Sequence, residues 1–454
     1  MHMKDSFGLR SQPLQPLLFK MIVANSIGVL ATLSFGLVDT YFVSILGTAA
    51  LSAINFTHPI TLLFIACTTG IAIAFGTHLS FVLATAPSPS SQSLWMHTLL
   101  GSLGLTIIWS GFCYVSADWI IHRLGASASV QDQALSYLHA WLRGTPLLMG
   151  AILGQQALKS IGDTKANAWL CCFTAALNAL FDALFILGWG SWEGYGIEGA
   201  AYASCLAWSI HICLLGWRLH SKHRLFLPLH QMQRTLFNTH WRQLLTIASP
   251  ATMTMILNPI SHAILIAMLA DQGEVAMIAY GTGAQIQSFC ILGVTAVSAA
   301  VMPFIAQNLS VQQNHRAYVG FQTGLRWLLA WQGLIFIGMH LNSHTIAAWF
   351  TQDPAVMPWL TFYLEWVSLG FVPLAMTILI VNALHAYQQS KLALRINFIR
   401  SVFVMIPLAY LGQHYYGAIG IFMAPLITNF GVGMICCVLS LQLQWPSKRH
   451  WAVN

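Results

Sequence analysis

Long apolar runs dominate the chain, and charged, polar, proline or glycine residues separate each run from the next. A bilayer has a hydrocarbon core of ~30 Å, so a helix needs ~20 mostly apolar residues to cross it. Dividing the chain at its polar clusters predicts twelve membrane-spanning helices, over residues 15–46, 49–84, 94–117, 133–158, 165–189, 195–218, 241–270, 274–306, 317–341, 357–385, 393–412 and 416–444. The pattern therefore predicts an all-α polytopic membrane protein.

The longest polar connection lies at the middle of the chain and separates six predicted helices from six. We predict an N-lobe over residues 1–218, a cytoplasmic linker over residues 219–240 and a C-lobe over residues 241–454. Each lobe then holds six predicted helices, so both lobes enter the membrane from the same side.

The two halves also resemble each other in sequence. A shift of 226 residues sets Lys165 on Lys391, and a shift of 221 residues sets the Tyr-Gly pair at Tyr195 on the pair at Tyr416. Parallel repeats of this kind are related by an axis along the membrane normal, and substrates bind between them near the midplane. The sequence predicts two pseudo-symmetric six-helix lobes around a central cleft.

Composition excludes a soluble protein. Charged residues make up 7% of the 454 residues, and the mean hydropathy is +0.68. Soluble globular proteins carry roughly 25% charged residues, so this chain cannot build a water-facing surface over its whole length. The nine cysteines have no spacing suited to a zinc or redox site, so we expect no metal site of that kind.

The basic residues are explained by topology. If the N-terminus is cytoplasmic, 17 of the 19 Lys and Arg residues lie in or beside cytoplasmic segments, as the positive-inside rule requires. We place Lys391, Arg395 and Arg400 among them, whereas Arg123 lies outside and Arg143 within the fourth span. We expect a multi-pass protein of the bacterial inner membrane with both termini cytoplasmic, and no nucleic-acid partner.

Four charged residues remain within or deep inside predicted spans: Asp39, Arg143, Asp182 and Glu365. An acid at the centre of a helix costs near 3 kcal/mol on insertion scales, so such residues face the protein interior or water and are functional by default. At the helical rise, the three acids lie ~10–12 Å from the outer face. For Arg143 we expect a buried partner, because that depth limits access to the membrane surface.

The fifth span carries a polar face. Thr174, Asn178 and Asp182 follow one another at intervals of four residues, which places them on one side of a helix. A buried carboxyl favours its neutral form, and two neighbouring carboxyls disfavour double ionisation, so Asp39 and Asp182 together can bind a proton near neutral pH. The same oxygens can coordinate Na⁺, and the sequence leaves both ions open. Asn55 lies near the depth of Asp39 and is a candidate neighbour.

Four motifs then carry a resemblance to a known family. They are LVDTYFVSILGTAALSAINFTHPI (Leu37–Ile60), ALKSIGDTK (Ala157–Lys165), YGIEGAAYAS (Tyr195–Ser204) and VMPFIAQNLS (Val301–Ser310). Together and in this order they resemble the multidrug and toxic compound extrusion (MATE) transporters, nearest to the DinF-like branch, over almost the full length. The resemblance implies twelve helices in two lobes and export of amphipathic, often cationic compounds, driven by inward H⁺ or Na⁺.

The resemblance also implies residue roles. Members of the family have a cation-coupling site in the N-lobe. By resemblance its residues correspond to Asp39, Asn178 and Asp182 of this chain, with Tyr137 in the supporting network. The chain departs from the family at Ala200, where a threonine is usual, and the lost hydroxyl favours H⁺ over Na⁺. The family implies a transporter rather than an enzyme, with no cofactor beyond the coupling ion, with drugs and membrane lipids as partners, and acting as a monomer.

Some alternatives stay open at this point. Glu365 resembles the second-lobe acid of another branch, so a second coupling site in the C-lobe remains a hypothesis. A lipid-linked oligosaccharide flippase of the related carrier superfamily is an alternative function, although such a protein needs a basic cavity for pyrophosphate and only Arg143 is placed deeply by the sequence. A membrane enzyme is disfavoured, since neither a His-Asp nor an Asp-Asp motif occurs at a membrane face.

Overall fold

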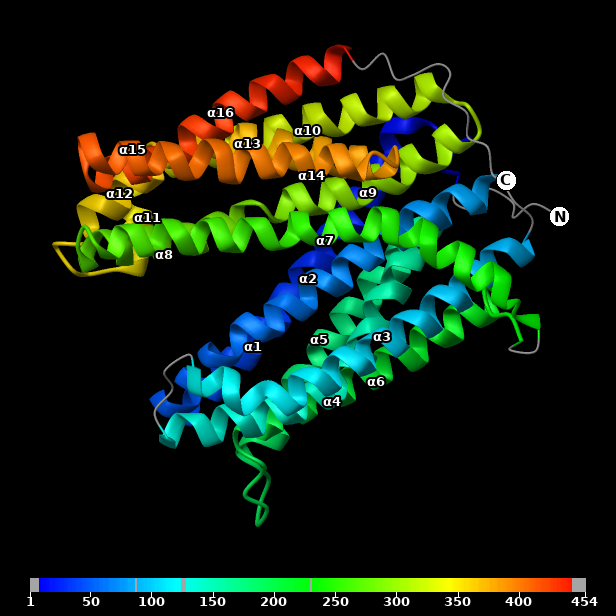
Figure 1. Ribbon diagram of the computed structural model, residues 1–454, viewed down its shortest axis with the longest axis horizontal. Helices are drawn as coiled ribbons and strands as arrows, with labels where there is room; N and C mark the ends of the chain where they lie inside the picture. The colour runs from blue at the N-terminus through cyan, green and yellow to red at the C-terminus, as the bar shows by residue number, and fades with distance from the viewer. Residues whose placement is uncertain (1–7, 86–87, 124–127, 229–230, 443–454) are drawn as a thin grey trace. The chain divides into compact units, whose positions relative to one another are not determined.

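The computed structural model describes residues 8–85, 88–123, 128–228 and 231–442 (Figure 1). Within these ranges nearly every residue is helical, and the β structure consists of an isolated bridge between Trp189 and Trp192. Two compact units are present: unit 1 comprises Met1–Ser11 and Phe19–Thr252, and unit 2 comprises Gln12–Leu18 and Met253–Asn454. The lobe and linker boundaries predicted from the sequence stay a prediction.

Unit 1 is built on six helices and the first half of a seventh. They are α1 (Leu14–Ile45), α2 (Thr48–Thr85), α3 (Ser88–Arg123), α4 (Ala128–Ile161), α5 (Thr164–Leu187), α6 (Ile197–Ser221) and α7 (Arg234–Ala270). Helix α4 packs against α2, α3 and α6, and α5 packs against α6. Helix α4 is therefore the centre of the unit, and α5 and α6 form a pair beside it.

Unit 2 contains the end of α7 and a more fragmented set of helices. They are α8 (Glu274–Cys290), α9 (Leu292–Ser310), α10 (Asn314–Leu341), α11 (Ser343–Phe350), α12 (Met357–Glu365), η2 (Val367–Gly370), α13 (Phe371–Ala386), α14 (Ser390–Phe398), η3 (Ile399–Met405), α15 (Ile406–Tyr416) and α16 (Ala418–Gln442). Helix α13 packs against α9, α10 and α16, α12 packs against α8, and α15 packs against α16.

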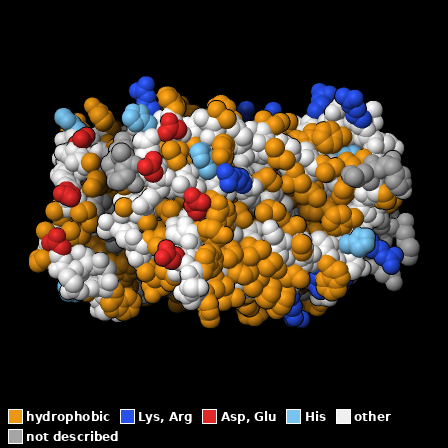
Figure 2. Space-filling view, turned by 90° about the horizontal axis from the view of Figure 1, so that it is seen from below, with side chains coloured by type: hydrophobic (Ala, Val, Ile, Leu, Met, Phe, Trp, Pro, Cys, Tyr) orange, Lys and Arg blue, Asp and Glu red, His pale blue; other side chains and the backbone are white. Residues whose placement is uncertain are grey.

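The predicted spans correspond to these helices in order. Ten helical stretches of the described residues are long and apolar enough to cross a membrane. Helices α4 and α10 correspond to the two remaining predictions and carry more polar side chains. The all-α polytopic fold is thus confirmed. Large apolar side chains remain exposed, including Ile108, Val115 and Leu341, as contact with lipid requires, and Figure 2 shows such side chains over much of one face.

Three of the spans are irregular. One is interrupted at Ile291 between α8 and α9, one contains the 3₁₀ segment η2, and one contains the π-helical segment η3. At the first interruption Gln332 of α10 donates its side-chain amide to the carbonyl of Cys290, with an N–O distance of 2.8 Å. That bond satisfies a backbone oxygen near the break, which is what a membrane interior demands.

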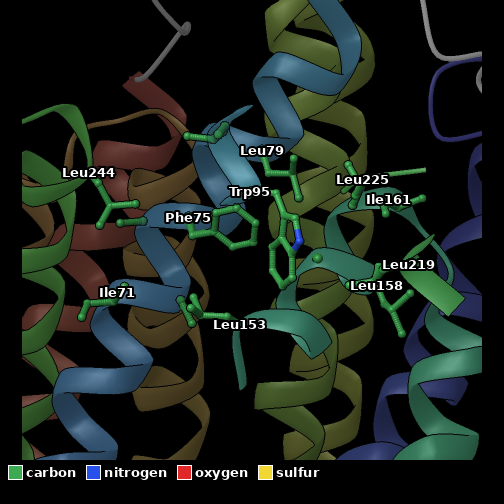
Figure 3. Close-up of a cluster of buried hydrophobic side chains, with 14 of the residues drawn as sticks. Ile71, Phe75, Leu79, Trp95, Leu153, Leu158, Ile161, Leu219, Leu225 and Leu244 are labelled. Carbon is green, nitrogen blue, oxygen red and sulfur yellow. The ribbon is translucent and has the colours of Figure 1, made fainter. Parts of the chain in front are cut away.

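A large hydrophobic cluster holds unit 1 together at one end (Figure 3). Its labelled members come from α2, α3, α4, α6, α7 and the segment after α6: Ile71, Phe75, Leu79, Trp95, Leu153, Leu158, Ile161, Leu219, Leu225 and Leu244. All of them are buried, so the cluster joins helices that are distant in sequence. The cluster also includes Leu170 of α5, so this packing gives α5 and α6, which carry most of the polar residues described next, a fixed framework.

Candidate cation-coupling site

Asn178 joins the two acids of unit 1. Its side-chain nitrogen donates to Asp39 Oδ1 at 2.5 Å and to Asp182 Oδ2 at 2.7 Å. Asn178 and Asp182 lie on α5 and are fully buried, whereas Asp39 lies on α1 and is half-buried. The structure therefore brings together the three residues to which the sequence assigned a cation site.

The two carboxyl groups also interact directly. Asp39 and Asp182 are close enough to share a hydrogen bond, and Ser204 of α6 bonds to Asp39 as well. An ionised carboxylate can only accept, so a hydrogen bond between two carboxyls requires a proton on one of them. Tyr137 lies within electrostatic range of both acids. Asn178 Oδ1 and Asp182 Oδ1 are buried without a hydrogen-bond partner in the described residues, so they remain available as acceptors.

A glycine lets α5 and α6 approach closely beside this cluster. A Cβ at Gly199 would lie 2.2 Å from the backbone oxygen of Phe185, so no larger residue fits there without separating the helices. The short distance between the two helices brings Ser204 of α6 within reach of the carboxyl pair. The backbone of α5 and α6 thereby positions three of the four polar side chains of the cluster.

Thr174 belongs to a second hydrogen-bond network, adjacent to the carboxyl pair. Its hydroxyl donates to the carbonyl of Leu170 at 2.7 Å and lies 2.6 Å from His211 Nδ1. A hydroxyl has one proton, so Thr174 must accept from an Nδ1–H of His211. The other ring nitrogen of His211 lies 3.3 Å from the side-chain nitrogen of Gln155 and accepts from it. The buried His211 is therefore a neutral ring fixed in one tautomer.

Sequence reasoning missed the roles of Ser204 and His211. Ala200, where the sequence departs from the family pattern, has a buried methyl side chain, and Ser204 lies one turn further along α6. His211 lies two turns beyond Ser204, on the same side of the helix. Ala200, Ser204 and His211 are separated by four and seven residues, which places them on one side of α6. That spacing could have predicted a hydroxyl and an imidazole beside the polar face of α5.

Asn55 and Arg143 lie outside the cluster. Asn55 is exposed on α2. The prediction of a buried partner for Arg143 is wrong: its side chain is exposed, and its guanidinium donates to the Tyr114 hydroxyl at 3.1 Å and lies 5.7 Å from the centre of that ring. The physical reason is helical rotation, because the neighbouring Leu142 and Thr145 point into the packed side of α4 and turn residue 143 away.

Glu365 makes local contacts at the end of α12. Its carboxylate accepts from Ser343 Oγ at 2.9 Å, and its backbone oxygen lies 3.0 Å from His340 Nδ1. These bonds connect α12 to α10 and α11. A second coupling site at Glu365 stays a prediction.

Arg400 lies deeper than its grouping with the basic residues of the cytoplasmic side suggested. It was counted in or beside a cytoplasmic segment, within the predicted span 393–412, and the helical stretch Ser390–Tyr416, which is apolar enough to span a membrane, holds it well inside its ends. The span starts earlier than the predicted residue 393, so Arg400 lies about 15 Å along the helix axis. Its side chain is only 5% exposed.

Asp163 accepts from a basic cluster outside the spans, between α4 and α5. Its carboxylate lies 2.8 Å from Arg218 Nη2, 3.2 Å from Lys222 Nζ and 3.0 Å from His223 Nε2. Burial alone would raise the pKa of Asp163, but the hydrogen bonds from His223 and Arg218 and the charges of Arg218 and Lys222 outweigh burial and hold it well below its usual value. The cluster ties the α4–α5 connection to the end of α6.

Comparison with known proteins supplies the family context. The MatE family model matches residues 25–184 and 250–411, one stretch in each half and at an offset close to the 226-residue shift found in the sequence. The chain is 34% identical over 451 residues to a protein of Shewanella oneidensis named FAD transporter, covering 98% of both. It is 21% identical over 434 residues to the multidrug export protein MepA of Staphylococcus saprophyticus, covering 95% of this chain and 94% of that one.

A solved structure shares the fold. A crystal structure of a mutant of VcmN, a MATE transporter of Vibrio cholerae, superposes with a TM-score of 0.89 at 23% identity, covering 96% of this chain and 98% of that chain. At this level of identity the likeness shows the fold alone. It agrees with the twelve helices predicted from the sequence.

Proposed function

The chain belongs to the multidrug and toxic compound extrusion (MATE) family, and on that premise we propose that it is a secondary active exporter of small organic molecules. The MepA relatives are named multidrug export proteins, which supports amphipathic compounds, often cationic, as cargo. The duplicated halves support alternating access, in which the two repeats rearrange around a cargo site. We place both termini in the cytoplasm because the basic residues concentrate on that side.

The observation that carries this proposal is the bridge from Asn178 to both Asp39 and Asp182. While the carboxyl pair shares a proton, α1 is hydrogen-bonded to α5. Loss of that proton leaves two like charges in contact, which repel each other and favour separation of α1 from α5. Much of α1 is exposed, including Leu30, Leu37 and Tyr41, so few packing contacts oppose its movement. Proton occupancy and the conformation of unit 1 thereby become linked.

Inward H⁺ is the coupling ion that we favour. A direct bond between two carboxyls needs a proton and cannot form around a metal ion in the same place. The unpartnered oxygens of Asn178 and Asp182 supply the argument for Na⁺ as the alternative.

Reconstituted vesicles distinguish the two ions. Export of the cationic dye ethidium from proteoliposomes is measured under an imposed pH gradient and, separately, under an imposed Na⁺ gradient. We expect the pH gradient alone to drive export. Export that responds only to Na⁺ would reverse the ion assignment, and export that ignores both gradients would remove the coupled-transport proposal.

A flavin dinucleotide is a second candidate cargo. The Shewanella oneidensis relative named FAD transporter is considerably more similar to this chain than the multidrug relatives described above, at 34% against 21% identity. Direct measurement of FAD export from the same vesicles tests it. The flippase alternative lacks comparable support, because neither type of relative bears the name of a lipid carrier.

A further inference from the structure

Unit 2 contains a cavity with a polar wall. It has a volume of about 560 Å³, within the range of small-molecule sites. Polar groups come from residues that include Asn258, His262, Gln287, Arg400 and Asn429, and further residues of α7, α8, α13, η3 and α16, most of them apolar, line the remainder. All of these residues belong to unit 2, so the cavity is complete within that unit.

Arg400 is the unusual member of this wall. It lies in the π-helical segment η3 of a membrane span and is only 5% exposed. Arginine at the middle of a span is costly to insert, so it is retained where it serves a function. Segments of π-helix occur frequently at functional sites for the same reason, since they are less stable than regular helix.

No acid neutralises Arg400 within the described part of unit 2. The ion pairs found in the described residues all involve Asp163, in unit 1. The acids of unit 2 lie at helix ends or in connections: Asp271, Glu274, Asp353 and Glu365. The buried guanidinium therefore keeps a full positive charge facing the cavity.

Two amides hold the guanidinium in place and add donors of their own. Arg400 Nη1 donates to Asn429 Oδ1 at 3.1 Å, and Arg400 Nη2 donates to Asn258 Oδ1. Arginine can only donate, so the oxygen of each amide must face it and the NH₂ group of each amide must point elsewhere. Gln287 follows the same pattern, because its oxygen accepts from the Tyr363 hydroxyl at 2.8 Å.

The cavity is consequently rich in donors. Arg400 Nε is buried and has no hydrogen-bond partner in the described residues, and the amide nitrogens of three cavity residues remain for a ligand. Donors from several directions suit a tetrahedral phosphate, whose oxygens point in several directions, better than a planar carboxylate. The apolar part of the wall suits an attached organic body.

We propose that this cavity binds an amphipathic organic phosphate and that Arg400 recognises its phosphate group. The inference rests on the proposed export function and narrows it, since it assigns an anionic class of cargo to unit 2. It is independent of the carboxyl pair in unit 1, which concerns the coupling ion.

A series of flavins tests the site on the unaltered protein. Riboflavin, flavin mononucleotide (FMN) and FAD share one ring system and carry no, one and two phosphates, and their binding to the purified full-length chain is measured by quenching of flavin fluorescence. Charge-assisted hydrogen bonds contribute about 1.5–3 kcal/mol, so FMN and FAD should bind ~10–100-fold more tightly than riboflavin. Equal affinity for the three flavins would overturn the proposal.

Substitution then assigns the effect to Arg400. Arg400→Gln should lower FMN affinity at least ~10-fold and leave riboflavin binding unchanged. The FMN affinity of Arg400→Lys should lie between that of Arg400→Gln and that of the unaltered protein, because lysine keeps the charge but lacks the planar guanidinium. The matched control is Arg395→Gln on the same span, where the side chain is exposed and FMN affinity should not change. Unchanged FMN affinity in Arg400→Gln would overturn the assignment. If Arg400→Gln does not fold, the FMN affinity of Arg400→Lys and the affinities of the unaltered protein for the three flavins test the proposal instead.

The same preparations separate this inference from the proposed function. Arg400-dependent FMN binding without gradient-driven export of FMN or ethidium would support the phosphate site and contradict the proposed export function. Gradient-driven ethidium export without FMN binding would support the proposed export function and contradict the phosphate site.

Discussion

At the scale of single residues, spacing along a helix proved a reliable guide to one part of the candidate site. The four-residue interval predicted that Asn178 and Asp182 share a face, and in the structure one amide bridges both acids. The same reasoning did not find Ser204 or His211, because a hydroxyl and an imidazole in an apolar span have several ordinary uses. It also misjudged Arg400, which falls inside the predicted span 393–412 but was grouped with the basic residues at the cytoplasmic end of that span.

Asp182→Asn tests the shared proton. Asparagine has the same shape but cannot take up a proton, so the two residues can no longer share one and the repulsion between two carboxylates is lost. We expect ethidium export under a pH gradient to fall at least tenfold while the purified protein remains folded. The control is Glu193→Gln, an exposed acid in the same unit, which should retain full export. Full activity in Asp182→Asn would rule out this residue as a coupling group.

Thr174→Val tests whether Thr174 supports the site or couples the ion. Valine keeps the shape but removes the hydroxyl that accepts from His211, which leaves the Leu170 carbonyl as the remaining partner of that buried ring, at a cost of about 0.5–1.5 kcal/mol for the lost hydrogen bond. We expect a lower unfolding temperature in detergent, together with export that still depends on the pH gradient. Loss of gradient dependence with unchanged thermal stability would instead place Thr174 in the coupling step.

At the scale of helices, the number and order of the spans followed from hydrophobicity, but their interruptions did not. The break between α8 and α9 occurs at Ile291, in a stretch with no proline at the break, and Gln332 from another helix bonds to the carbonyl beside it. Such a contact joins residues distant in sequence, so no local pattern reveals it. The sequence around Arg400 likewise has no local pattern that predicts the π-helical segment.

Gly199→Ala tests the close contact between α5 and α6. The added methyl would meet the backbone oxygen of Phe185 at 2.2 Å, so the helices must separate. Overpacking of this kind costs about 1–3 kcal/mol, and the shift should also weaken the bond from Ser204 to Asp39. We expect lower thermal stability and reduced export.

Gly216→Ala on the same helix is the matched control for that substitution. A Cβ at this position meets nothing within 4 Å, so alanine should be neutral or slightly stabilising through its better helix propensity. Equal effects of the two substitutions would mean that the close approach at Gly199 is unimportant.

At the scale of the whole molecule, the duplication was the most informative sequence feature, and the MatE model matches both halves at nearly the predicted offset. The halves have nevertheless diverged in charge. Unit 1 contains a carboxyl pair, and unit 2 contains a buried guanidinium that forms no ion pair with an acid in the described residues. An internal repeat predicts shared backbone architecture, but it does not predict which copy retains a given polar side chain.

The pH dependence of stability follows from Asp163. Its pKa is lowered on folding, so its ion pairs stabilise the protein fully above the unfolded pKa of about 3.9, and that contribution is lost as the pH falls through the folded value. We expect Asp163→Asn to be less stable than the unaltered chain by about 2 kcal/mol at neutral pH. The difference should shrink below about pH 4, as followed by thermal unfolding in detergent. A difference that stays constant across this range would contradict the assignment.

The unpaired charge of Arg400 has a consequence for membrane voltage. An organic phosphate carries close to two negative charges near neutral pH, so its exit together with the entry of one proton moves about three charges in the same electrical sense. At ~2.3 kcal/mol per charge for each 100 mV, an inside-negative potential of about 100 mV then contributes about 7 kcal/mol per cycle. A monovalent cation exchanged for one proton gains nothing from the potential. Clamping the voltage at zero with valinomycin and potassium should therefore slow FMN export strongly and leave ethidium export unaffected, and equal slowing of both would contradict an anionic cargo. A single arginine in one half of the protein would thus decide whether export draws on the electrical or only on the chemical part of the proton gradient.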